Sequence, residues 1–256
     1  MIFETHAHYD DEQFDEDREE LLLSMQNHGI DKIINIGCDR KTCEATIDLM
    51  ETYDFVYGAI GVHPSDIRTM DEELFSWMRQ QLSHPKVVAV GEIGLDYYWD
   101  KEEEIQKMQR DWFVRQLELA KEADLPFIIH SRDAAADTLE IMKQEHRDNS
   151  RGVIHCFSYS KEIAKEYVKM GYYIGVGGVS TFKNAKKLKE VIVEIPIEHI
   201  LLETDCPYMA PEPYRGKRNS SLYLPYVVKK IAELKDMKEE EVEEITYHNA
   251  EKLFRL

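Results

Sequence analysis

Residues 86–96 read KVVAVGEIGLD, and the run of β-branched and small apolar residues at 86–91 leads directly into the acidic residue Glu92. An apolar run of this length, bounded by turn residues, is typical of a buried strand. Similar runs recur along the chain at 2–5, 32–37, 55–61, 126–130, 152–155, 172–177 and 200–204. The sequence therefore predicts eight short strands.

Segments with helical character separate these runs. In residues 102–124, for example, an apolar stripe is expected to face the core; it comprises Ile105, Met108, Trp112, Leu119 and Ala123. Strands that alternate with helices indicate parallel strands joined by crossovers, and eight such units favour an α/β fold of the TIM-type (β/α)8 class. A doubly wound open sheet is the alternative. With no linker-like stretch in the sequence, we expect one domain over residues 1–256.

Composition excludes several classes of protein. No apolar run approaches the roughly 20 residues that span a bilayer, and four cysteines without C-x-x-C spacing argue against a disulfide framework. These features predict a cytoplasmic protein with no membrane contact and no evident obligate protein partner. The net charge of −18 disfavours non-specific attraction of nucleic acid, so a phosphate-bearing substrate would need a locally positive site.

Residues able to bind a metal gather at the ends of the predicted strands. Five of the ten histidines lie there, together with two carboxylates: His6, His8, His63, Glu92, His130, His155 and Asp205. Active sites of (β/α)8 barrels form at the C-terminal ends of the strands, which favours the barrel over the open sheet. His6 and His8 are two residues apart in an extended segment, so their imidazoles point the same way.

Six of these side chains are the expected metal ligands. Because they outnumber the ligands of one four-coordinate ion, we expect two divalent ions that share Glu92. His6, His8, Glu92 and Asp205 are assigned to one ion, and Glu92, His130 and His155 to the other. Asp205 is also the expected general base, since a carboxylate beside a metal-bound water can take its proton.

The order of ETHAHYD, GVHP, VGEIGLDYY, PFIIHSRDA, IHCFS and LLETDCPYMAPEPYRGKRN resembles the TatD family of metal-dependent hydrolases, within the amidohydrolase-like barrels. The resemblance spans nearly the whole chain. It implies a divalent-metal phosphoesterase with deoxyribonuclease activity, the same six ligands, and His63 and Glu203 in the active site. Departures are Glu4 where Asp is more frequent, Tyr159 where Gly is common, and Ser220 and Ser221 where Glu-Pro is usual.

Three arginines supply the positive charge that the acidic total requires. Arg132, Arg215 and Arg218 are expected to contact substrate phosphate, because guanidinium groups bind phosphate in a bidentate way. The expected substrate is DNA or another phosphodiester. Mg²⁺, Mn²⁺ and Zn²⁺ all remain open as the metal, because imidazole-rich sites accept several ions.

Two alternatives to a nuclease remain open at this point. One is a small-molecule amidohydrolase or phosphotriesterase-like enzyme on the same barrel. Several such barrels bridge their metals with a modified lysine at the fourth strand, whereas this sequence has Glu92. The other is a metal-loaded binding protein without turnover, against which the complete set of ligands and the free base argue.

Overall fold

The computed structural model describes residues 1–256 and contains one eight-stranded sheet in which the strands follow the order of the sequence. The eight predicted strands are all present. They are β1 (Ile2–Ala7), β2 (Ile30–Ile36), β3 (Val56–Ile60), β4 (Val87–Asp96), β5 (Phe127–Arg132), β6 (Gly152–Ile154), β7 (Tyr173–Val176) and β8 (Ile200–Leu202).

Helices follow the strands in alternation. They are α1 (Arg18–Ser24), α2 (Arg40–Thr52), α3 (Glu72–Gln81), α4 (Glu103–Glu122), α5 (Ala135–Glu145), α6 (Lys161–Lys169), α7 (Lys186–Glu194), α8 (Leu224–Lys235) and α9 (Glu239–Phe254). Short 3-10 helices lie between them, among them η3 (Pro64–Thr69). Parallel pairing in sequence order with intervening helices is the (β/α)8 fold, so the predicted TIM-type class is confirmed.

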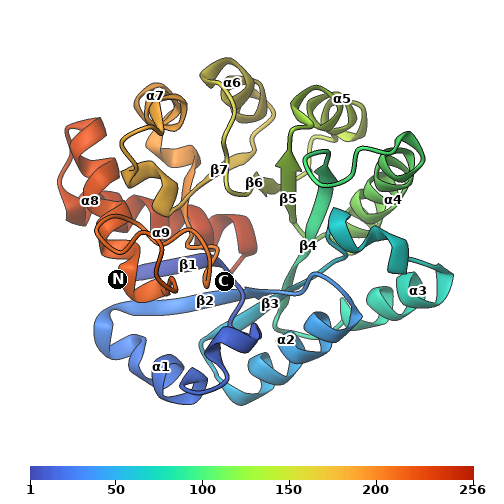
Figure 1. Cartoon of the computed structure of the whole chain (residues 1–256), viewed down its shortest axis with the longest axis horizontal. Coiled ribbons are helices and arrows are strands. Elements are labelled where there is room, and N and C mark those ends of the chain that lie inside the picture. Colours follow the sequence, from blue (N-terminus) through green and yellow to red (C-terminus); the bar gives the residue numbers. More distant parts are fainter. The chain divides into compact units, whose positions relative to one another are not determined.

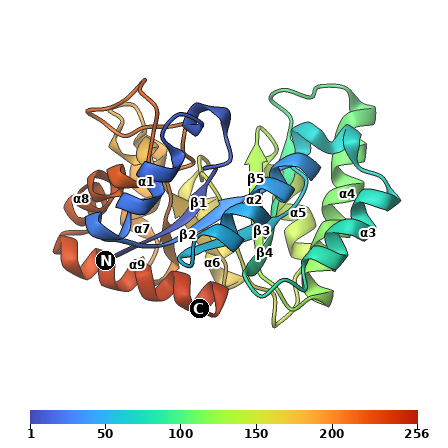
Figure 2. The same ribbon diagram turned by 90° about the horizontal axis from the view of Figure 1, so that it is seen from below.

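The chain divides into two compact units, residues 36–155 and residues 1–35 together with 156–256. The expectation of a single domain over 1–256 stays a prediction. In the first-named unit, β3, β4 and β5 lie side by side, with α4 packed on β4 (Figure 1). In the other unit, α9 packs against β1 (Figure 2). Phe3 on β1 is buried against Tyr247 and Phe254 on α9. None of the helices combines the length and the hydropathy that a membrane-spanning segment requires.

Strand β4 is longer than the sequence indicates and is buried over its whole length. It continues through Glu92 to Asp96, with a shift in its register against β5 between Val90 and Ile93. Gly94 has a φ of 144°, and a Cβ atom there would lie 1.9 Å from the carbonyl oxygen of His130 on β5. Only glycine allows the two strands this approach, which brings Glu92 and His130 together.

The core-facing side of α4 differs from the predicted stripe. Met108 and Ala123 are exposed, whereas Gln109, Phe113 and Gln116 are buried. Gln116 donates to the carbonyl of Val62 and accepts from its amide, at 3.3 and 2.9 Å. Leu119 is buried as predicted. The prediction was wrong for Met108 and Ala123, because the buried glutamines bind main-chain groups of other elements, a demand that apolar periodicity does not reveal.

Candidate metal centre

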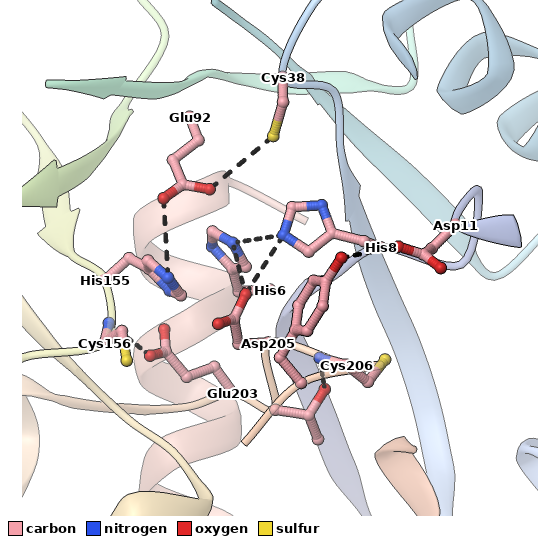
Figure 3. A network of polar contacts seen from close by, with 12 residues as sticks. His6, His8, Asp11, Cys38, Glu92, His155, Cys156, Glu203, Asp205 and Cys206 are labelled. Atoms are coloured by element: carbon pink, nitrogen blue, oxygen red, sulfur yellow. Dashed lines mark hydrogen bonds and ion pairs between the residues drawn. The ribbon is translucent and has the colours of Figure 1, made fainter. Parts of the chain in front are cut away.

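His6, His8 and Asp205 form one cluster of possible metal ligands (Figure 3). The Nε2 atoms of the two histidines lie 3.2 Å apart, and Oδ1 of Asp205 lies 3.3 Å from His8 Nε2 and 3.8 Å from His6 Nε2. A tetrahedral ion with bonds of about 2.0–2.1 Å needs ligand atoms roughly 3.3–3.4 Å apart. Two imidazole nitrogens and a carboxylate oxygen at this spacing fit a divalent cation.

Main-chain hydrogen bonds place this cluster. The amide of Asp205 donates to the carbonyl of His6 at 2.9 Å, and the amide of His8 donates to the carbonyl of Cys206 at 2.9 Å. The segment after β8 therefore pairs in parallel with the end of β1, with Ala7 opposite Cys206. Asp205 adopts a φ of 59°, a left-handed conformation that Asp tolerates better than most residues. Its side chain is 19% exposed, which leaves it open to solvent.

Glu92 is the centre of a second cluster, in the unit formed by residues 36–155. Its Oε1 atom lies 2.8 Å from His130 Nδ1, 3.7 Å from His63 Nε2 and 3.7 Å from His155 Nε2. The carboxylate is almost fully buried, and Figure 3 shows it between His155 and Cys38. One carboxylate that reaches three imidazoles is a donor set suited to a divalent metal.

Asp96 fixes the orientation of His130. Its Oδ2 atom lies 3.0 Å from His130 Nε2, and its Oδ1 atom accepts from the amides of Tyr98 and Trp99 at 3.0 and 3.1 Å. Burial lowers the pKa of His130, but the hydrogen bonds to Asp96 and Glu92 outweigh it, so that pKa is raised. Burial raises the pKa of Asp96, but the hydrogen bonds from His130 and from the Trp99 amide leave it lowered. A carboxylate behind a histidine in this way holds Nδ1 ready for a metal.

His63 contacts the second cluster with one edge of its ring. Its Nδ1 atom accepts from the amide of Ser65 at 3.1 Å at the start of η3, which leaves Nε2 directed at Glu92. The ring also packs edge-on against His130 with centroids 4.3 Å apart. The local turn thus fixes the ring, and the predicted place of His63 in the active site stays a prediction.

Glu203, the other carboxylate predicted in the active site besides the metal ligands, is buried beside β7. Its Oε1 atom accepts from the amide of Cys156 at 2.6 Å. A Cβ atom at Gly175 would lie 2.2 Å from Oε2, so β7 needs glycine there to admit this carboxylate. The carboxylate thereby holds Cys156 in place, and its part in catalysis stays a prediction.

Glu4 lies in a buried network that the sequence did not indicate. Its carboxylate accepts from the amide of His6, from the amide and hydroxyl of Thr204, and from the hydroxyl of Ser221. Desolvation by burial raises its pKa to about 7, although these hydrogen bonds lower it. Glu4 and Ser221 both depart from the family pattern, and in this chain they contact each other at 2.9 Å.

The three arginines expected at substrate differ in what they contact. Arg218 is held by both carboxylate oxygens of Asp17, at 2.7 and 2.6 Å. Arg215 stacks over Phe182, and Arg132 stacks over Tyr98. The phosphate contacts of all three remain predictions, and in this structure the guanidinium of Arg218 is already occupied.

Cys38 and Asp96 are polar neighbours of Glu92 and His130 to which the sequence assigned no ligand role. The thiol of Cys38 lies 4.0 Å from Glu92 Oε2. The sequence could have identified Cys38 as a neighbour of the metal centre, because it lies two residues after β2, at the same end of a strand as the predicted ligands. Asp96 contacts Nε2 of His130 at 3.0 Å, the position of a carboxylate that orients a histidine.

A (β/α)8 fold with two clusters of imidazoles and carboxylates, in contact with the C-terminal ends of its strands, defines the class of metal-dependent hydrolase barrels. The sequence model of the family described as TatD related DNase matches residues 3–255. The chain therefore belongs to the TatD family, as its motifs had indicated.

Relatives in this family support the assignment of this chain as a metal-dependent hydrolase. The metal-dependent hydrolase YabD of Bacillus subtilis is 48% identical over 256 residues and matches the whole of both chains. The metal-dependent hydrolase TatD of Mycobacterium tuberculosis is 32% identical, over 89% of this chain and 87% of the relative. The crystal structure of the TatD homologue YjjV from Escherichia coli superimposes with a TM-score of 0.92 at 32% identity, over 100% of this chain and 98% of that one.

Proposed function

We propose that this TatD-family hydrolase cleaves phosphodiester bonds, with DNA as the substrate, and that it uses two divalent ions bound by the six predicted ligands. The observation that carries the proposal is the reach of Glu92, whose Oε1 atom lies within 3.7 Å of three imidazole nitrogens. A carboxylate with this many histidine neighbours is suited to bridging two ions.

The proposed assignment follows the positions of the ligands along the strands. Glu92 and His130 lie within β4 and β5, His6 lies near the end of β1, and the other ligands follow the ends of β1, β6 and β8. The C-terminal ends of the strands carry the active sites of (β/α)8 barrels. The proposed assignment gives His6, His8 and Asp205 to one ion and His130 and His155 to the other, with Glu92 shared. When bound, two such ions neutralise charge on a phosphodiester and lower the pKa of water.

The side chains of the protein then divide the remaining work. Asp205 is the proposed general base, because its carboxylate is within 3.8 Å of both histidines and is partly open to solvent. Asp96 holds His130 in one orientation through Nε2, which leaves Nδ1 on the side of Glu92. His63 presents Nε2 beside Glu92 and is the proposed donor to the phosphate or the leaving group.

The test is hydrolysis of bis-p-nitrophenyl phosphate and of single-stranded DNA by protein freed of metal and then supplied with Mg²⁺, Mn²⁺ or Zn²⁺. We expect turnover with at least one ion, its loss in chelator, and its loss in Glu92→Gln, which keeps the shape of the side chain but removes the charge. His248→Ala is the matched control, since this exposed histidine on α9 contacts only the main chain of its own helix turn and its neighbouring ring. Turnover of neither substrate with any ion would contradict the proposal.

A further inference from the structure

Two large aromatic side chains are exposed directly after β4. Trp99 is 66% exposed and Tyr98 is 43% exposed, which is unusual for aromatic residues in a chain whose strands are buried. Their rings stand edge to face, with centroids 4.7 Å apart and an angle of 84° between the planes. The neighbouring Tyr97 points elsewhere, because its hydroxyl donates to Asp137 and accepts from Arg110. Tyr98 and Trp99 are therefore presented to solvent as a pair.

Arg132 at the end of β5 completes this surface. Its guanidinium carbon lies 4.0 Å from the ring centroid of Tyr98 and 5.5 Å from that of Trp99. Eight other arginines are held in ion pairs with carboxylates. Arg132 makes no ion pair, although the protein carries a net charge of −18. Stacking fixes its plane and leaves its N–H groups available to an anion.

Asp96 connects this surface to the second cluster of the candidate metal centre. One carboxylate oxygen accepts from the amides of Tyr98 and Trp99, and the other contacts His130. Arg132 lies two residues after His130 on β5, so the two side chains project from the same face of that strand. The aromatic pair and the unpaired guanidinium are thus fixed to the same carboxylate and the same strand as a proposed metal ligand.

We propose that Tyr98, Trp99 and Arg132 form a nucleotide subsite, in which the indole of Trp99 stacks on an unpaired base and Arg132 binds a neighbouring phosphate. This inference rests on the proposed function and extends it to the form of the substrate, which is a single strand. Aromatic rings stack on any base, whereas the paired bases of a duplex cover their faces. A guanidinium beside the ring supplies the local positive charge that an acidic protein needs to hold phosphate.

Binding of a labelled single-stranded oligodeoxynucleotide, followed by fluorescence anisotropy, tests the subsite without depending on turnover. Each protein is also titrated with a matched oligonucleotide from which the bases have been removed. We expect Trp99→Leu to raise Kd for the normal oligonucleotide roughly five- to hundredfold and to leave Kd for the abasic one unchanged. Arg132→Gln should weaken both and reduce the salt dependence of binding.

The chain offers a matched pair of controls. Arg40 stacks over Trp77 at 4.1 Å, as Arg132 does over Tyr98, but it is paired with Glu44. Trp77→Leu and Arg40→Gln should therefore leave both values of Kd unchanged. Equal binding by the wild-type protein and Trp99→Leu, or an equal loss with the abasic strand, would overturn the proposal, as would an absence of oligonucleotide binding by the wild type.

The outcome is separable from that of the proposed function. Hydrolysis of bis-p-nitrophenyl phosphate by Trp99→Leu, measured in parallel, reports whether the metal centre is intact. Base-dependent binding without turnover of any phosphodiester would retain the subsite and refute the nuclease. Turnover of phosphodiesters, with oligonucleotide binding that is unchanged in Trp99→Leu, would retain the nuclease and refute the subsite.

Discussion

Asp96→Asn tests how much the second cluster depends on a carboxylate that is not itself an expected ligand. Asp96 accepts hydrogen bonds on both oxygens, from His130 on one side and from two amides on the other. An asparagine side chain has one acceptor oxygen and one donor NH2 group. If its oxygen accepts from the two amides, its NH2 group faces Nε2 of His130, and a hydrogen bond there requires the His130 proton to move to Nδ1. A hydrogen bond to a charged group contributes about 1.5–3 kcal/mol. We therefore expect metal affinity to fall roughly 10- to 100-fold, in line with other histidine partners of metals.

Isothermal titration of metal-free protein with Zn²⁺ measures this loss, and Asp100→Asn is the control. Asp100 is also buried and is bonded by Arg68 and Gln109 at 2.9 and 3.0 Å, but it contacts no histidine. The control should bind Zn²⁺ as the wild type does, even if it is less stable. Wild-type affinity in Asp96→Asn, with a normal fold, would refute the idea that Asp96 prepares His130 for a metal.

Three further changes give separate tests. Gly94→Ala should destabilise the protein by about 3 kcal/mol or more and reduce metal binding, because its Cβ meets the carbonyl of His130; urea unfolding and metal titration measure both. Gln116→Met should cost about 2–4 kcal/mol in urea unfolding, because it leaves the amide and carbonyl of Val62 unpaired. Two lysines lower the pKa of Glu194 to about 2, so its stabilising contribution is present above its unfolded pKa of about 4.5 and is lost as pH falls toward 2. The difference in unfolding free energy between wild type and Glu194→Gln should shrink over that range, and a constant difference would contradict the assignment.

The strands were predictable because the apolar runs that indicate them are local features of the sequence. Buried parallel strands need continuous apolar runs, and each of the eight runs became a strand within a few residues of its predicted bounds. The end of β4 was less well predicted, because the strand continues through charged Glu92 and Asp96, whose burial depends on partners from β5. The buried face of α4 was predicted incorrectly for a similar reason, since its buried glutamines form hydrogen bonds with main-chain groups outside the helix.

The candidate site, too, was predictable only in part from the sequence. The residue types and their places near strand ends predicted the ligand set, namely His6, His8, Glu92, His130, His155 and Asp205, and the structure gathers these side chains into two clusters that could each hold a metal. Nothing in the sequence showed that Glu4 and Ser221 would share a buried hydrogen bond. These positions are more than two hundred residues apart, so only folding reveals that they fit each other.

By itself, then, the sequence determined the fold class and the family of this protein, since both depend on local apolar periodicity and on motifs of fixed spacing. The tertiary structure decided which side chains face one another: that Asp96 orients His130, and that Arg132 stacks on Tyr98 while Arg218 is paired with Asp17. The physical reason is the separation along the chain of the residues that interact. Strand propensity acts between neighbours in the chain, whereas the partner of a charge is chosen among all the groups that folding brings within a few ångströms.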